Sequence, residues 1–162
     1  MQLNKQYNML SYLITLLLAM CLIILPLPAF LSSVNPDWVL LALIYWVLAI
    51  PEKIGVFNAW FVGMFVDILT GRILGLHALS YALISYVCLT FHKRLRQYPI
   101  AQQSLFVFFC LFFSQMLVFW IQNIQGVTEF TLAFWGPVLS GALFWPLVYF
   151  TFYFIRIFGR IS

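Results

Sequence analysis

The chain has 162 residues, of which 65% are hydrophobic and only 7% are charged, and its mean hydropathy is +1.04. Soluble domains carry about 25% charged residues, so this composition excludes an ordinary soluble domain and predicts an integral membrane protein. With 3 cysteines, 8 glycines and 7 prolines, the chain is also not a disulfide scaffold, a collagen-like fibre or a disordered protein.

The expected fold is all-α, with one transmembrane helical bundle over residues 1–162. A spanning helix takes about 20 apolar residues, so the chain has room for about six spans and no extramembrane domain. The pattern of apolar runs predicts helices at about residues 9–31, 36–50, 54–70, 73–91, 101–121 and 131–155.

The second of these helices is short. Asn35 is the expected N-cap, with Pro36 at the first helical position, Asp37 favourable beside the helix dipole and Trp38 at the membrane interface. At about 15 residues the helix covers roughly 22 Å, less than the ~30 Å hydrocarbon core. It therefore either thins the bilayer or is shielded by neighbouring helices.

A stripe of small residues, interrupted by one carboxylate, runs along the third predicted helix and the turn after it. Small residues at every fourth position let another helix approach closely. We expect the stripe to pack inside the bundle rather than to form an oligomer interface. Its members are Gly55, Ala59, Gly63, Asp67, Gly71 and Gly75.

Asp67 lies in the last turn of that helix, where a carboxylate opposes the helix dipole and needs a partner. Arg72 and the amides of the following loop are the expected partners. A structural or partner-contacting role is favoured over proton or ion handling, because the sequence gives no second intramembrane acid, lysine or histidine relay beside Asp67.

The basic residues predict the orientation of the chain. With six spans and a cytoplasmic N-terminus, seven of the eight basic residues fall on the inner side and only Arg72 faces outward. This predicts a multi-pass protein of the bacterial cytoplasmic (inner) membrane with both termini cytoplasmic. The inner seven are Lys5, Lys53, Lys93, Arg94, Arg96, Arg156 and Arg160.

The inner basic residues leave a second interpretation open, since such a face also suits anionic membrane lipid or a cytoplasmic partner. Plain topology is the favoured interpretation. The net charge of +4 is too dispersed to indicate nucleic-acid binding.

Nothing in the sequence indicates an enzyme. It has no nucleophile elbow, zincin motif, phosphate-binding loop or paired carboxylates for acid–base work. His77 and His92 have no Cys, His or carboxylate at metal-ligand spacing, so both are expected to be structural. No catalytic residue, metal or cofactor is expected.

Two motifs resemble the bacterial rod shape-determining protein MreD family. One is residues 35–41, Asn-Pro-Asp-Trp-Val-Leu-Leu, leading to Ile-Tyr-Trp at 44–46. The other is residues 63–79, Gly-Met-Phe-Val-Asp-Ile-Leu-Thr-Gly-Arg-Ile-Leu-Gly-Leu-His-Ala-Leu. The chain length, the hydropathy pattern and the Trp-Pro pair at 145–146 also agree.

The resemblance implies a non-catalytic scaffold or adaptor of the cell-elongation (rod) complex, which maintains rod shape during lateral peptidoglycan synthesis. Implied partners are MreC, the MreB filament, and RodA with its penicillin-binding transpeptidase. The fold implied by the family is like that of the substrate-binding subunits of energy-coupling-factor transporters. The fold alone does not carry their transport function over.

The site expected under this interpretation has two faces. Asp37, Trp38, Asp67 and Arg72 would shape an outer surface for MreC, and Lys93, Arg94 and Arg96 an inner contact. The alternative is a small-molecule, vitamin-like binding subunit of a membrane transporter, which a vitamin would stabilise thermally. A lipid-precursor flippase is weaker still, because no basic residue is expected deep in the membrane.

Overall fold

The computed structural model describes residues 3–126 and 131–161, with side chains described over 9–126 and 131–158. The predicted all-α class is confirmed for this part of the chain, which holds seven α-helices and one 3₁₀-helix. In order they are α1 (Leu3–Ile24), α2 (Ala29–Ser32), α3 (Trp38–Ala49), α4 (Val56–Thr70), α5 (Leu76–Leu95), α6 (Ile100–Ile124), η1 (Leu132–Trp135) and α7 (Gly136–Ile161).

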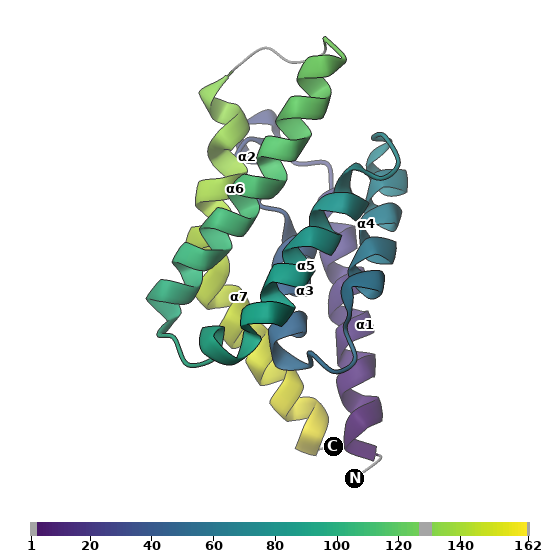
Figure 1. Ribbon diagram of the computed structural model, residues 1–162, viewed down its shortest axis with the longest axis vertical. Coiled ribbons are helices and arrows are strands. Elements are labelled where there is room, and N and C mark those ends of the chain that lie inside the picture. The colour runs from purple at the N-terminus through teal and green to yellow at the C-terminus, as the bar shows by residue number, and fades with distance from the viewer. Residues whose placement is uncertain (1–2, 127–130, 162) are drawn as a thin grey trace.

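The long helices run alternately up and down the molecule, and both termini lie at one end (Figure 1). We call this the terminal end; it also carries the α3–α4 and α5–α6 connections. The opposite end, here called the turn end, carries the α4–α5 turn and the connection from α6 towards η1 (Figure 1).

The C-terminal end predicted for the first helix is wrong. The helix was expected over residues 9–31, but α1 ends at Ile24 and the one-turn helix α2 follows at Ala29. Pro26 and Pro28 lie between them, and a proline both lacks an N–H and disfavours helical geometry in the residue before it. The break adds a helix to the six expected.

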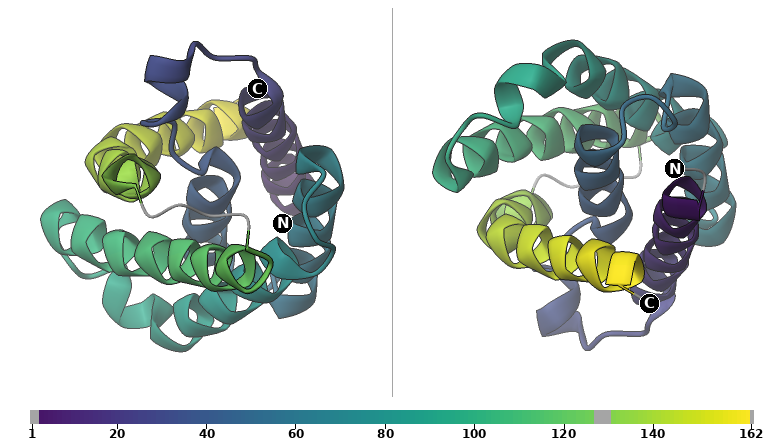
Figure 2. Two further views of the ribbon diagram at one scale, coloured as in Figure 1. Left: turned by 90° about the horizontal axis from the view of Figure 1, so that it is seen from above. Right: turned by 90° about the horizontal axis from the view of Figure 1, so that it is seen from below.

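The short helix α3 lies at the centre of the bundle. All residues from Val39 to Leu48 are buried, and in Figure 2 the helix is surrounded by the others. Twelve residues cover about 18 Å, so α3 cannot cross a bilayer by its own length. Of the two expected ways of accommodating a short helix, shielding by neighbouring helices is the one confirmed.

Two polar contacts hold α1 against this core. The buried Trp46 indole nitrogen of α3 donates to Thr15 Oγ1 of α1 at 2.8 Å. The Tyr12 hydroxyl of α1 donates to the Asn58 side-chain oxygen of α4. Interhelical hydrogen bonds of this kind help to orient helices where both helices and lipid are apolar.

The outer surface of the bundle is rich in large apolar side chains. Phe57 on α4 is 81% exposed and Leu143 on α7 is 80% exposed. Two segments of the described chain, Ile100–Ile124 and Leu132–Phe158, are long and apolar enough to cross a membrane, while Met9–Ile24, Trp38–Ala49 and Val56–Thr70 are shorter apolar helices. An apolar exterior of this extent is what a lipid environment requires.

Candidate functional site

The α4–α5 hairpin at the turn end contains most of the residues singled out in the sequence. The two helices approach most closely at Gly63, where an added Cβ would lie 2.5 Å from the Ala78 amide nitrogen and 2.6 Å from the carbonyl carbon of His77. Only glycine permits this approach. The prediction that the small-residue stripe packs inside the bundle is confirmed at Gly63 and at Ala59, which is fully buried.

The glycines at the turn end of the stripe have another function. Gly71 ends α4 at φ 62°, and Gly75 precedes α5 at φ 101°, a backbone region that favours glycine. A Cβ at either position would meet nothing within 4 Å. These two glycines therefore shape the turn and do not pack helices.

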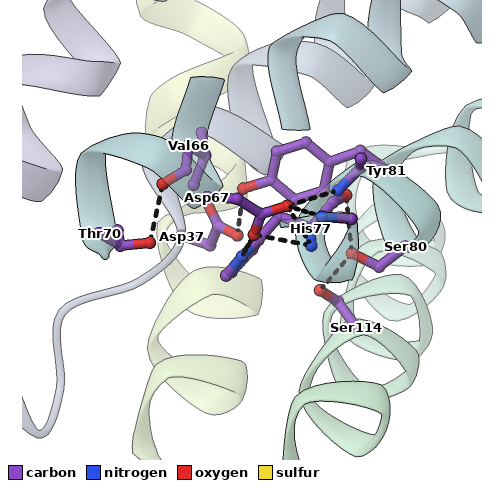
Figure 3. Close-up of polar contacts among 10 residues, drawn as sticks. Asp37, Val66, Asp67, Thr70, His77, Ser80, Tyr81 and Ser114 are labelled. Carbon is purple, nitrogen blue, oxygen red and sulfur yellow. Dashed lines mark hydrogen bonds and ion pairs between the residues drawn. The ribbon is translucent and has the colours of Figure 1, made fainter. Parts of the chain in front are cut away.

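Asp67 is fully buried at the N-terminus of α5 (Figure 3). One carboxylate oxygen accepts from the Gly75 amide at 2.9 Å, and the other accepts from the His77 amide at 3.0 Å. The Ala78 amide lies 3.4 Å from the first oxygen. Of the two partners expected for Asp67, the loop amides are confirmed, whereas Arg72 is exposed and no ion pair joins it to Asp67 in the described chain.

Asp67 thus caps a helix other than its own. The first amides of a helix have no partner within it, and a side chain at the N-cap usually satisfies them. Gly75 occupies the N-cap position of α5 and has no side chain. The carboxylate of Asp67 therefore accepts from the amides at this helix end in place of an N-cap side chain. Asp67 opposes the dipole of α4 but lies at the favourable end of α5, which offsets the cost expected from the sequence.

His77 completes the surroundings of Asp67. Its Nδ1 lies 2.7 Å from Asp67 Oδ1, and both side chains are buried. The sequence did not predict this pair, because His77 was compared only with metal-ligand spacings and no histidine was expected beside Asp67. The signal was present in the spacing: ten residues that contain two turn glycines bring the histidine of one helix back to the aspartate of the preceding one.

A second, partly buried carboxylate lies nearby (Figure 3). Asp37 accepts from the hydroxyl of Tyr81 at 2.7 Å, and the Tyr81 ring packs edge-on against the His77 ring at a centroid distance of 5.6 Å. Further along α5, the Ser80 hydroxyl donates to the His77 carbonyl at 3.1 Å. We call Asp37, Asp67, His77, Ser80 and Tyr81 the polar cluster.

Asp37 is also the N-cap of α3, which corrects the expectation that Asn35 has this role. Asp37 Oδ1 accepts from the Leu40 amide at 3.1 Å, and Asn35 instead accepts from the Trp38 indole nitrogen at 2.7 Å. Asn and Asp are comparable N-caps, and a carboxylate also interacts favourably with the helix dipole. The expected surface role of Trp38 is only partly met, since its ring is half-buried against Phe144.

The hydrogen bonds of the polar cluster join α5 to α4 through Asp67 and to the start of α3 through Asp37. We call this arrangement the clamp. Each carboxylate is held by donors from within the protein, and Asp67 has no exposed surface. A cavity of about 20 Å³ lies against Asp37, which is room for about one water molecule. The described residues contain no group of three His, Cys, Asp or Glu that could hold a metal ion.

The basic residues expected at the inner contact lie at the terminal end and differ from one another. Lys93 and Arg94 are exposed near the end of α5. Arg96 has a structural function that the sequence did not indicate: its Nε donates to the Leu48 carbonyl at 2.5 Å and its Nη2 to the Ala49 carbonyl at 2.7 Å. It thereby caps the C-terminus of α3, where a cation is favourable.

The comparisons agree with this architecture. The pattern of the family described as rod shape-determining protein MreD matches residues 3–157. The chain belongs to the MreD family. MreD is a membrane protein of rod-shape determination, and no enzymatic activity is known for it. The chain is similar to the rod shape-determining protein MreD of Haemophilus influenzae, with 32% identity over 133 residues, 82% of each chain. No solved structure matches it significantly.

Proposed function

We propose that the chain is a non-catalytic scaffold of the rod complex, which couples MreC and the MreB filament to lateral peptidoglycan synthesis by RodA and its transpeptidase. The observation that supports a scaffold is the state of the polar cluster: Asp67 is fully buried, and both carboxylates of the cluster are already bound by backbone amides, a histidine or a tyrosine. Carboxylates that are bound in this way hold helices in position.

The proposed topology is a multi-pass protein of the inner membrane with both termini cytoplasmic. The described basic residues Lys53, Lys93, Arg94, Arg96 and Arg156 belong to elements at the terminal end, and Arg72 belongs to the turn end. Short loops rich in Lys and Arg remain on the cytoplasmic side. The side chains of Lys5 and Arg160 lie outside the described residues. The likeness to energy-coupling-factor subunits remains an expectation.

The surface proposed for MreC is the α4–α5 turn. Asp67 holds this turn in place from inside, and the residues that the turn exposes are Arg72, Ile73 and Leu74, the last two at 45% and 60%. This modifies the earlier hypothesis, because Asp67 supports the surface without being part of it. Lys93 and Arg94 are the proposed cytoplasmic contact for the filament.

The geometry around the polar cluster favours the scaffold over a vitamin-binding site at Asp67. Ligand pockets of that kind have volumes of about 300 Å³ or more, whereas the cavity beside Asp37 measures about 20 Å³. A vitamin that raised the melting temperature of the purified protein by several degrees would reverse this conclusion.

The test exchanges the charge of the exposed turn. Arg72→Glu should reduce co-purification with MreC without lowering the melting temperature, because the Arg72 side chain is exposed. Arg94→Glu is the matched control, an exposed arginine at the opposite end, and should leave MreC binding unchanged. Equal MreC recovery from both variants would remove the turn from the interface. Rods that persist after depletion of the protein would refute the scaffold role itself.

A further inference from the structure

A second polar region lies at the terminal end, away from the polar cluster. Two adjoining cavities of about 310 and 380 Å³ share Ala49, Arg96 and Arg156. Seen from the terminal end, α3 lies between α5 and α7, so that its C-terminus is the floor of this region (Figure 2). We call the two cavities together the basic cleft. Its other lining residues are Tyr45, Leu48, Ile50, Pro51, Glu52, Lys53, His92, Gln103, Tyr149 and Tyr153.

One of the two arginines of the cleft is held in place before any ligand arrives. Arg96 is fixed by the carbonyls of Leu48 and Ala49, which use two of its five N–H donors. Arg156 is half-buried and lines both cavities. In the described chain no ion pair joins either arginine to a carboxylate, so both charges remain available to an anion.

The other charges that line the cleft leave it positive. Lys53 and His92 also line the second cavity, and Glu52 is the one carboxylate among the lining residues of the two cavities. Two guanidinium groups that line one space suit the binding of a phosphate, because each presents several N–H donors to its oxygens.

The deep wall of the cleft contains an unsatisfied acceptor. Gln103 is 5% exposed, and its Nε2 donates to the Leu95 carbonyl at 2.9 Å and to the Tyr98 carbonyl at 3.3 Å. Its side-chain oxygen is buried with no hydrogen-bond partner in the described structure. A buried acceptor of this kind is costly, and because this oxygen is closed off from the cleft it offers no contact to a ligand.

The position of the cleft points to a lipid as the source of the phosphate. The segment of α7 that supplies Tyr149, Tyr153 and Arg156 also has outward apolar side chains, among them Phe150 at 49% and Phe154 at 57% exposed. Tyrosines and arginines beside such a surface are typical of the membrane interface. Acyl chains would cover the phenyl rings while the headgroup enters the cleft.

We propose that the basic cleft binds an anionic glycerophospholipid such as phosphatidylglycerol, with its phosphate between Arg96 and Arg156. This inference rests on the proposed cytoplasmic position of the terminal end and not on the adaptor role. A bound lipid here would link the C-terminus of the central helix α3 to α7.

The test measures the lipid that remains bound to the purified protein, by native mass spectrometry after extraction in a neutral detergent. The wild-type protein should retain phosphatidylglycerol in preference to phosphatidylcholine. Arg156→Gln should lower the retained phosphatidylglycerol about fivefold, the factor that corresponds to about 1 kcal/mol for one basic residue at an anionic surface. Arg94→Gln, which changes an exposed arginine outside the cleft, should leave retention unchanged. Equal loss from the two variants would overturn the assignment.

A second measurement needs no variant. Phosphatidylglycerol added to the delipidated wild-type protein should raise its melting temperature more than phosphatidylcholine does, because a ligand of the folded state stabilises it. The same rise with inorganic phosphate or glycerol phosphate would assign the cleft to a free phosphate and overturn the lipid. No rise with any of these compounds would overturn the site.

Discussion

The replacement of Asp67 by alanine tests the clamp most directly. In the native protein the carboxylate accepts from the Gly75 and His77 amides and pairs with the His77 ring. Asp67→Ala leaves both amides buried without a partner, and each unsatisfied donor costs about 1–3 kcal/mol. We therefore expect the free energy of unfolding to fall by about 2–6 kcal/mol, before any loss from the ring is added.

The conservative variant separates the charge from the shape. Asp67→Asn keeps one acceptor oxygen and presents an NH₂ group to donors at the other position, so it should cost about half as much as Asp67→Ala. Hydrogen bonds between membrane helices average only about 0.6 kcal/mol, and a loss several times larger than this would be the signature of a carboxylate that caps a helix.

The assay is unfolding of the purified protein in mixed detergent micelles, followed by circular dichroism. Glu52→Ala is the control, because this carboxylate is exposed. If Asp67→Ala unfolds at the same denaturant concentration as the control, the buried carboxylate contributes nothing to stability and the clamp is refuted. A greater loss for Asp67→Asn than for Asp67→Ala would refute the assignment of its oxygens as acceptors.

Two further predictions use the same assay. Gly63→Ala should destabilise the bundle by about 1–3 kcal/mol, because the added methyl overlaps the backbone of Ala78, whereas Gly55→Ala has open space and should cost less than about 1 kcal/mol; equal effects would contradict the close approach of α4 and α5. Tyr81→Phe removes the buried hydroxyl that donates to the partly buried carboxylate of Asp37 and should cost about 1.5–3 kcal/mol, while Tyr86→Phe, at an exposed position of the same helix, should cost almost nothing. Unchanged stability of both tyrosine variants would show that the bond to the carboxylate is not stabilising.

The second predicted helix, α3 in the structure, shows how much of the fold the sequence predicts and where the prediction ends. Its approximate bounds and its length deficit follow from apolar pattern and the rise per residue. The sequence did not decide whether neighbouring helices shield it, because this depends on where those helices lie in the bundle. Its cap was placed two residues early, because Asn35 and Asp37 are both good caps and the choice between them depends on the approach of the Tyr81 hydroxyl to Asp37.

Arg96 illustrates a limit of another kind. In the sequence it is one of several basic residues in a polar stretch, and nothing distinguishes it from Arg94. The structure distinguishes them, since only Arg96 reaches the carbonyls at the end of α3, nearly fifty residues earlier in the chain.

By itself, the sequence determined the helical class, the membrane setting and the family, because these follow from composition, periodicity and local motifs. It also predicted that Arg72 or loop amides bind Asp67, of which the structure shows the amides, and that the small-residue stripe packs inside the bundle, which holds at Ala59 and Gly63. Only the tertiary structure decided that Asp67 pairs with His77, that Asp37 pairs with Tyr81, and that the arginines of α7 and the α5–α6 connection share one cleft. Each of these joins residues from different helices, and such contacts depend on the packing of helices in three dimensions, which no local pattern contains.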